Sequence, residues 1–356
     1  MPAISVLIPS HGRARKLAAC IAPLAEQTRD LDAEVLIGFD GPDESASETA
    51  ERAWSQAGGD PEHLRFMHLP RRGANESRTS LLEASTGPLV ITLNDDVVPE
   101  DGFLEAHRRA HEPRMGHPMI AVGYSPYLPV GKPTAIDRLV SETDLVFFWR
   151  RMLDSPNPAH DHGFRCAVTL NFSAPRDAII AAGGFAVSLG RYGHDDIELA
   201  HRMQTRLGCP VHFVPGATAH HDHRHTAEDL LQREYLLGAS MAHYARLNPD
   251  FGSAIAGHDV CAPETLDYYR LYIDTERRDA QRAAAAFLSL ADVPASNLSN
   301  DLIGEIVKLH VPARRWLWRR GLLDAPESGG TEIDPAKALS DLGICNQLSQ
   351  QLQAAS

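Results

Sequence analysis

The sequence predicts an α/β protein built on a doubly wound, mainly parallel sheet, followed by a helical region from about residue 226. Short apolar runs alternate with helical patterns through the first hundred residues, whereas the pattern from Thr226 onward is almost wholly helical. Of the 356 residues, 43% are hydrophobic, which is enough for a sizeable core. This length allows one large domain or two smaller ones.

The first quarter of the chain alternates between strand-like and helix-like segments. Strands are expected where short apolar or β-branched runs end at a proline or a turn residue, at residues 4–8, 34–38, 65–69 and 89–93. Helices are expected between them, at residues 13–26, 45–57 and 75–84. Ser45 is the expected cap of the second helix, because Glu48 follows at the spacing of a capping box.

Further along, residues 119–124, 167–173 and 211–214 are expected strands, and residues 195–207 an expected helix. Residues 126–164 are rich in Pro, His and Asp and contain an apolar helical stretch at 136–153. We expect this segment to pass over one face of the sheet. The domain boundaries follow: one domain at 1–225, with halves at 1–115 and 116–225, and a helical region at 226–356.

The most informative segment is residues 89–104, where a buried apolar run ends in Asn94-Asp95-Asp96. Pro99 and Glu100 are expected to open a helix directly afterwards. In an open α/β sheet, ligands bind beyond the carboxyl ends of the strands, and paired carboxylates there are typical of a divalent cation that holds phosphates. The segment therefore predicts an enzyme for a nucleotide-linked substrate. The alternative is a turn with Asx chemistry.

Composition and hydropathy argue against several classes of protein. The formal net charge of -13 argues against a general nucleic-acid binder. The five cysteines are scattered and form no CxxC pair, which is typical of a reducing cytoplasm and gives no zinc site. Met1-Pro2-Ala3 leads straight into a strand-like run without a signal-peptide pattern. No apolar stretch approaches 18 residues, so no membrane span is expected.

Over roughly residues 3–245, the order of motifs resembles the family 2 glycosyltransferases, which have the GT-A fold. The motifs that carry the resemblance are Ile4-Ser-Val-Leu-Ile-Pro9 with His11-Gly12-Arg13, Phe39-Asp40-Gly41, Arg71-Arg72-Gly73 with Glu76-Ser77-Arg78, Leu93-Asn94-Asp95-Asp96-Val97, Gly183-Gly184-Phe185, His194-Asp195-Asp196-Ile-Glu198-Leu199 with Arg202, and Val214-Pro215-Gly216 with His220-His221-Asp222-His223. The resemblance implies a GT-A mixed sheet, a nucleotide-sugar half at 1–115 and an acceptor half at 116–225.

On the donor side, the resemblance implies that Asp40 accepts a hydrogen bond from the base, typically uracil, and that nearby arginines face the diphosphate or the donor sugar. The implied nucleotide and donor residues are Pro9, His11, Arg13, Asp40, Arg71, Arg78, Asn94 and Asp95. An ordinary Asp-Gly turn at residue 40 and solvated arginines at 71 and 72 are the alternatives.

The implied metal is Mn2+ or Mg2+, held by Asp96 and by a histidine of the 220–225 cluster. Counting from Pro215, His221 matches the family best and His223 second. Asn94 departs from the family pattern, since an acidic residue often stands there, and this weakens the case for two strictly spaced carboxylate ligands. The alternatives for the histidine cluster are a zinc site and plain loop histidines.

On the acceptor side, Asp196 is the implied general base, by its spacing to Arg202, and Asp195 supports it or contacts the acceptor. A neighbouring acid raises the pKa of the base, whereas a helix N-terminus lowers it. Gly183, Gly184 and Asn171 are expected near the bound sugars. The alternative for the acidic pair is simple capping of the helix.

The resulting hypothesis is an inverting, metal-dependent glycosyltransferase that uses a nucleotide sugar, typically UDP-linked, and a carbohydrate, lipid-linked or peptide acceptor. The alternatives are a retaining transferase and, because of Asn94, a degenerate module that binds without turnover. A nucleotidyltransferase and a dinucleotide-dependent oxidoreductase are disfavoured, since the loop after the first strand has one glycine only.

Arg314-Arg-Trp-Leu-Trp-Arg-Arg320 is the one basic and aromatic cluster. We interpret it as arginine stems that cover a helical subdomain. The alternative is an interfacial helix, with a lipid-linked acceptor. The expected location is the cytoplasm, either free or at the inner face of the membrane. No nucleic-acid partner is expected, and an oligomer is compatible with the sequence.

Overall fold

The computed structural model describes residues 2–112, 117–186, 193–326 and 333–344. The chain divides into two compact units. The first unit comprises Met1–Leu128, Phe147–Gly190 and Asp195–His223. The second unit comprises Pro129–Val146, Arg191–His194 and Arg224–Ser356.

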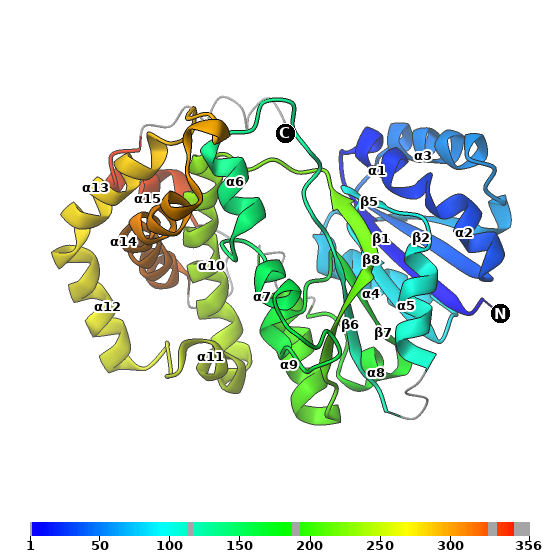
Figure 1. Cartoon of the computed structure of the whole chain (residues 1–356). Helices are drawn as coiled ribbons and strands as arrows, with labels where there is room; N and C mark the ends of the chain where they lie inside the picture. Colours follow the sequence, from blue (N-terminus) through cyan, green and yellow to red (C-terminus); the bar gives the residue numbers. More distant parts are fainter. Residues whose placement is uncertain (1, 113–116, 187–192, 327–332, 345–356) are drawn as a thin grey trace. The chain divides into compact units, whose positions relative to one another are not determined.

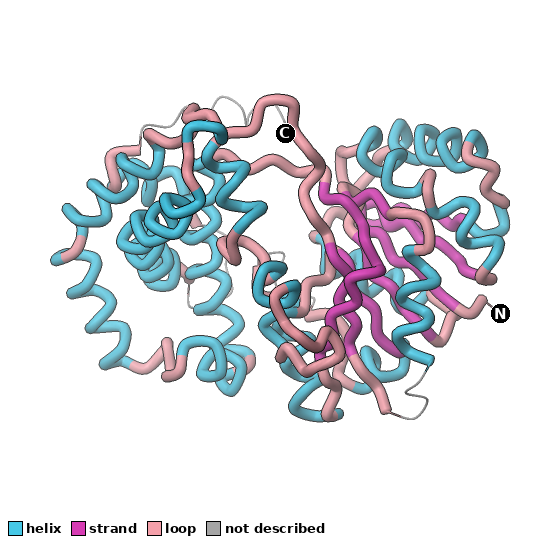
Figure 2. Tube along the Cα trace, in the orientation of Figure 1, coloured by secondary structure: helices cyan, strands magenta, loops and turns pink. Residues whose placement is uncertain are grey.

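The first unit is built on an eight-stranded mixed sheet with helices on both faces (Figures 1 and 2). Its strands are β1 (Ile4–Ser10), β2 (Ala33–Asp40), β3 (Leu64–Leu69), β4 (Leu89–Leu93), β5 (Val97–Pro99), β6 (Ile120–Tyr124), β7 (Asn171–Pro175) and β8 (Val211–His221). The strand order is β3-β2-β1-β4-β7-β6-β8-β5. Strand β7 runs antiparallel to β4 and β6, and β5 runs antiparallel to β8, whereas the other pairs are parallel. The expected mixed, mainly parallel sheet is confirmed.

Helices cover both faces of this sheet, which explains why every residue of β1 and β4 is buried. The helices of the first unit are α1 (Ala14–Ile21), α2 (Leu24–Asp30), α3 (Glu44–Gln56), α4 (Ala74–Ala84), α5 (Phe103–His111), α7 (Trp149–Leu153), α8 (Arg176–Ala181) and α9 (Asp195–Leu207). Helix α4 packs on β1 and β2, and α5 packs on β6 and β8.

The strand order contains a topological switch point between β1 and β4. From β1 the chain builds β2 and β3 on one side, and then returns to place β4 on the other side of β1. The loops after β1 and β4 therefore diverge at the same edge of the sheet. In open α/β sheets this is where ligands bind.

The second unit is helical within the described residues, as the sequence predicts. It contains α6 (Ala135–Glu142), α10 (Ala227–Leu247), α11 (Pro249–Ala256), α12 (Pro263–Thr275), α13 (Arg277–Leu288), α14 (Asn300–Asp324) and α15 (Pro335–Asp341). Glycines bring α10 and α14 together: a Cβ on Gly238 would lie 1.8 Å from the Trp318 carbonyl oxygen, and one on Gly321 2.0 Å from that of Tyr235. Among the described helices, none has the length and apolar character that crossing a membrane requires.

Two expected helices are broken. The helix predicted over residues 13–26 is observed as α1 and α2, with Pro23 between them, because proline has no N–H to continue the backbone ladder. The helix predicted over residues 136–153 is observed as α6 and α7, which belong to different units.

Two expected helix starts are also wrong. Asp43, rather than Ser45, caps α3, because its carboxylate accepts the N–H of Ala46 at 3.1 Å. Pro99 does not open a helix but ends the short strand β5, and α5 begins at Phe103 after Gly102 in a left-handed conformation.

Candidate active site

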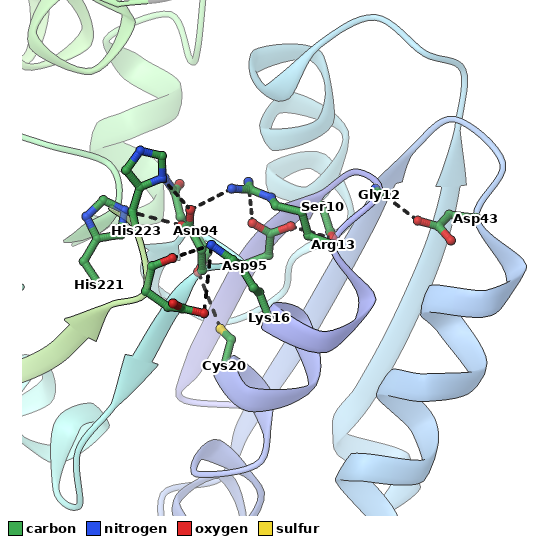
Figure 3. Close-up of polar contacts among 12 residues, drawn as sticks. Ser10, Gly12, Arg13, Lys16, Cys20, Asp43, Asn94, Asp95, His221 and His223 are labelled. Carbon is green, nitrogen blue, oxygen red and sulfur yellow. Dashed lines mark hydrogen bonds and ion pairs between the residues drawn. The ribbon is translucent and has the colours of Figure 1, made fainter. Parts of the chain in front are cut away.

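The acidic turn after β4 meets the loop after β1 at the switch point. The guanidinium of Arg13 lies between the two carboxylates, with Nη2 2.5 Å from Asp95 Oδ1 and Nη1 2.6 Å from Asp96 Oδ2 (Figure 3). Ser10 donates its hydroxyl to Asp95 Oδ2 at 2.7 Å. The end of β1 thus supplies a hydrogen-bond donor to the acids that follow β4, and the loop after β1 supplies a cation.

The two carboxylates differ in their electrostatics although both are buried. Burial raises the pKa of Asp95, and the charge of Arg13 and the Ser10 hydrogen bond offset this only in part. Burial also acts to raise the pKa of Asp96, but interactions with His221, Arg13 and His223 outweigh it and lower that pKa to about 2. Asp96 is therefore ionised across the neutral range.

Asp96, His221 and His223 form a group of ligands suited to a divalent cation. Their ligand atoms lie within 4.8 Å of one another. Asp96 Oδ1 is 3.7 Å from His221 Nε2, and Asp96 Oδ2 is 4.0 Å from His223 Nδ1. These separations suit atoms that each lie about 2.0–2.6 Å from one ion. Asp96 Oδ1 is buried and accepts no hydrogen bond from the described residues, so the group fits a cation.

Strand pairing positions His221, and ring stacking positions His223 beside it. His221 ends β8 and pairs with Val97 of β5, just after the acidic turn. His223 follows two residues later, and the two rings stack with centroids 5.4 Å apart. The His221 ring also stacks on Tyr127 at 5.2 Å. These contacts hold the imidazoles beside Asp96.

A buried arginine connects this turn to the acidic pair of α9. Arg78 donates from Nη2 to Asn94 Oδ1 at 3.0 Å and from Nη1 to Asp195 Oδ2 at 3.2 Å. Its Nη1 also donates to Asn75 Oδ1 at 3.1 Å. The amide oxygen of Asn94 therefore serves as an acceptor for Arg78.

Asp195 and Asp196 open α9, as the sequence predicts. Asp196 Oδ1 accepts the N–H of Ile197 at 2.8 Å. Burial, and then the charge of Asp195, raise the pKa of Asp196 to about 7, against the opposing effects of the Ile197 hydrogen bond and Arg78. A carboxyl group with such a pKa can take a proton and release it near neutral pH.

The carboxylate of Asp40 holds the loop that precedes α4. It accepts the N–H groups of Arg72 at 2.7 Å and of Gly73 at 3.0 and 3.1 Å. His11 Nδ1 donates to the Asp40 carbonyl at 2.8 Å, so His11 and Asp40 lie together, next to the buried Pro9 in β1. Arg71 is exposed and makes no hydrogen bond or ion pair to another described residue.

The three residues expected near the bound sugars make contacts within the fold. Asn171 begins rather than ends a strand, and its fully buried side chain bonds to His107 Nε2 at 2.9 Å and to the Ala217 carbonyl at 2.9 Å. Gly183 and Gly184, with φ of 101° and 67°, close the C-terminus of α8 by donating to the carbonyls of Ile180 and Ile179.

Sequence reasoning missed the structural role of Arg202. This buried side chain pairs with Glu198 at 2.8 Å and donates to the carbonyls of Ala182 and Gly184 at 2.6 and 2.8 Å. It ties the glycine turn to α9. Ser10 was also missed, and so was Lys16, whose Nζ donates to the Asp222 carbonyl (Figure 3). For Lys16, the signal in the sequence was its spacing of three residues from Arg13, which places both side chains on one face of a helix.

Comparisons with known proteins find a family match for part of the chain. Residues 5–115 match the family model described as Glycosyl transferase family 2. The mannosyltransferase PcManGT from Pyrobaculum calidifontis, solved in complex with GDP-Man and Mn2+, is 15% identical, with a TM-score of 0.53 over 90% of this chain and 87% of that chain. S. aureus TarS 1-349 is 11% identical, with a TM-score of 0.48 over 88% of this chain and 92% of that chain.

A search of curated proteins finds no match. The likeness to PcManGT shows that the two chains share a fold, and the curled mixed sheet with flanking helices is the GT-A arrangement that the sequence predicts. The family match and this fold together identify the chain as a glycosyltransferase that carries a family 2 domain.

Proposed function

We propose that the chain transfers a sugar from a nucleoside diphosphate sugar to an acceptor hydroxyl, with divalent-metal dependence and inversion at the anomeric carbon. The proposal is carried by the presence of two centres in one unit. One is the group of possible metal ligands at Asp96, His221 and His223, and the other is the acidic pair at the start of α9. Residues 1–115 supply the donor-side acids, and residues 116–225 supply Asp196 and the histidines.

On the donor side, Asp96, His221 and His223 would hold the ion. The carboxylate suits Mg2+ or Mn2+, and the two imidazole nitrogens favour Mn2+. Once bound, the ion neutralises charge on the departing diphosphate. Arg13, with 42% of its side chain exposed, can turn from the carboxylates to phosphate oxygens. The structure of PcManGT with GDP-Man and Mn2+ supports this class of donor.

On the acceptor side, Asp196 would take the proton of the attacking hydroxyl. Its raised pKa supports this role, since a base near pH 7 is matched to neutral conditions. Arg78 joins Asn94 to Asp195 and so fixes the acidic pair relative to the donor turn. The acceptor is a carbohydrate, lipid-linked or peptide hydroxyl. A retaining enzyme would use the acidic pair to bind the acceptor, and the anomeric configuration of the product separates the two mechanisms.

The second candidate is a module that binds nucleotide without turnover. The position of Arg13 favours it, because one guanidinium already contacts the carboxylates of both Asp95 and Asp96. Such a module would bind a nucleotide sugar in the absence of metal and would release no nucleoside diphosphate.

The decisive experiment measures nucleoside diphosphate release from UDP-, GDP- and dTDP-sugars with Mn2+, Mg2+ or EDTA. We expect release from one donor with Mn2+, loss of release with EDTA, and loss in Asp96→Ala. Asp101→Ala is the matched control, because it removes an exposed acid of the next loop, between β5 and α5, and should keep full activity.

Hydrolysis of the donor by water needs no acceptor, so a panel without acceptors is informative. Release that is equal in Asp96→Ala and in the parent would overturn the assigned metal site. If no donor is turned over and donors still raise the melting temperature in EDTA, the binding module replaces the transferase.

A further inference from the structure

The helical unit contains a pocket that the proposed transfer reaction leaves unused. Its volume is about 350 Å³, and its lining comes from α10, α11, α12, α14 and the loop after α11. Ligand pockets of proteins typically measure about 300–1,000 Å³, so this one suits a ligand of one or two sugar units.

Helix α14 turns its basic and aromatic segment toward this pocket. Arg314, Arg315, Trp318 and Arg319 line it, at the i, i+1, i+4 and i+5 spacing of one helical face. Trp316 points elsewhere and donates its indole N–H to the Ile273 carbonyl at 2.8 Å. The basic and aromatic segment at 314–320, which we expected to cover the helical subdomain, therefore has two parts. Trp316 packs away from the pocket, and the other side chains named here form part of its wall.

The pocket is positively charged in an otherwise acidic chain. Three arginines face a single glutamate, Glu234, whereas the chain as a whole carries a formal charge of -13. Neither Arg314 nor Arg315 forms an ion pair with a carboxylate among the residues that the structure describes, and both are exposed. Their guanidinium groups are available to an anionic ligand.

Aromatic side chains hold the third arginine and provide an apolar wall. The Arg319 guanidinium lies over the rings of Tyr272 at 4.2 Å and Tyr269 at 5.1 Å. Trp318 meets Tyr269 edge to face at 6.0 Å. The Tyr269 hydroxyl is 2.7 Å from His258 Nε2. The pocket therefore combines two exposed arginines and one arginine held by aromatic rings with the indole of Trp318, against which the apolar face of a sugar ring can pack.

Glu234 adds a polar group to the lining. It is buried, and burial raises its pKa against the opposing charges of Arg233 and Arg314. A carboxyl group in this position can exchange hydrogen bonds with ligand hydroxyls.

We infer that this pocket binds a saccharide unit that carries a phosphate or a carboxylate group. The arginine forks match the geometry of both anions, and the aromatic wall matches the sugar ring. The anionic part of this inference depends only on the pocket, whereas the choice of a saccharide rests on the proposed function.

The test uses the full chain, without donor or metal, and isothermal titration with glucose 6-phosphate, glucuronate, glucose and inorganic phosphate. We expect the two anionic sugars to bind at least about tenfold more tightly than glucose or phosphate, and Arg315→Gln to weaken them about tenfold. Arg282→Gln on α13 removes the same charge from an exposed position of the same unit and should not change binding. Asp96→Ala should not change it either.

Equal binding of inorganic phosphate and glucose 6-phosphate would overturn the saccharide assignment. Absence of binding by all four probes, or equal weakening in Arg282→Gln, would overturn the pocket itself. Binding to vesicles that contain anionic phospholipid, without binding to either anionic sugar, would replace it with a membrane contact. Because no donor is present, each result is independent of the transfer assay.

Discussion

At the scale of single residues, Asp196 is the side chain with the most specific expected chemistry. If it is the general base, Asp196→Asn removes proton acceptance and keeps a group of the same shape. We expect the transfer rate to fall by about 10²- to 10⁴-fold, with little change in donor KM. In the parent protein we expect the rate to rise with pH through about 7, as Asp196 loses its proton. Initial rates between pH 5 and 9 for both proteins measure this.

Stability provides an independent readout of the same carboxyl group. A carboxyl group in an unfolded chain has a pKa of about 3.9, whereas that of folded Asp196 is raised to about 7. Between these values the folded state binds more protons than the unfolded state, so the stability that Asp196 contributes is lost as pH rises. Asp196→Asn should therefore melt at or above the temperature of the parent at pH 8. A lower melting temperature, or full activity, would contradict the assignment.

At the scale of secondary-structure elements, Arg202 joins α9 to the turn that ends α8. Arg202→Ala should lower stability by about 3–5 kcal/mol, because it removes the ion pair with the buried Glu198 and the hydrogen bond to the Gly184 carbonyl. Urea unfolding measures the change.

The matched variant replaces both charges, Glu198→Gln with Arg202→Met. Because it leaves no unpaired charge, it should recover much of the lost stability. If Arg202→Ala and the double variant unfold at the same urea concentration, the contacts of Arg202 with the turn matter more than its pairing with Glu198.

Local patterns were sufficient to predict most elements and the acidic turn. The run 89–93 and the acids after it lie next to each other in sequence, so their place at a strand end follows from hydrophobic pattern alone. Pro23 and Asp43 also carried local signals for the helix break and the cap, which were overlooked. Asn171 could not be placed in this way, because its partners lie on β6, β8 and α5, far away in sequence.

At the scale of the whole molecule, the family match stops at residue 115, whereas the candidate site does not. Asp96 lies within the matched segment, and Asp196, His221 and His223 lie beyond it. Strand order explains how the histidines reach Asp96, since β5 pairs with β8 and so brings the end of β8 to the turn after β4. The sequence order of motifs predicted the components of this site, and the arginine contacts between them depend on the fold.

The division into two units leads to a last prediction. Gly321→Ala places a Cβ 2.0 Å from the Tyr235 carbonyl and should destabilise the helical unit by about 1–3 kcal/mol or more. Gly304→Ala, in the same helix with no neighbour within 4 Å, should stabilise it by about 0.5–1 kcal/mol.

All residues of the candidate donor site belong to the first unit, so the Mn2+-dependent affinity for UDP should be unchanged in both variants. Calorimetry and UDP titration measure the two effects separately. Loss of UDP affinity in a folded Gly321→Ala protein would mean that the helical unit supports the donor site, because the substitution itself lies outside the first unit.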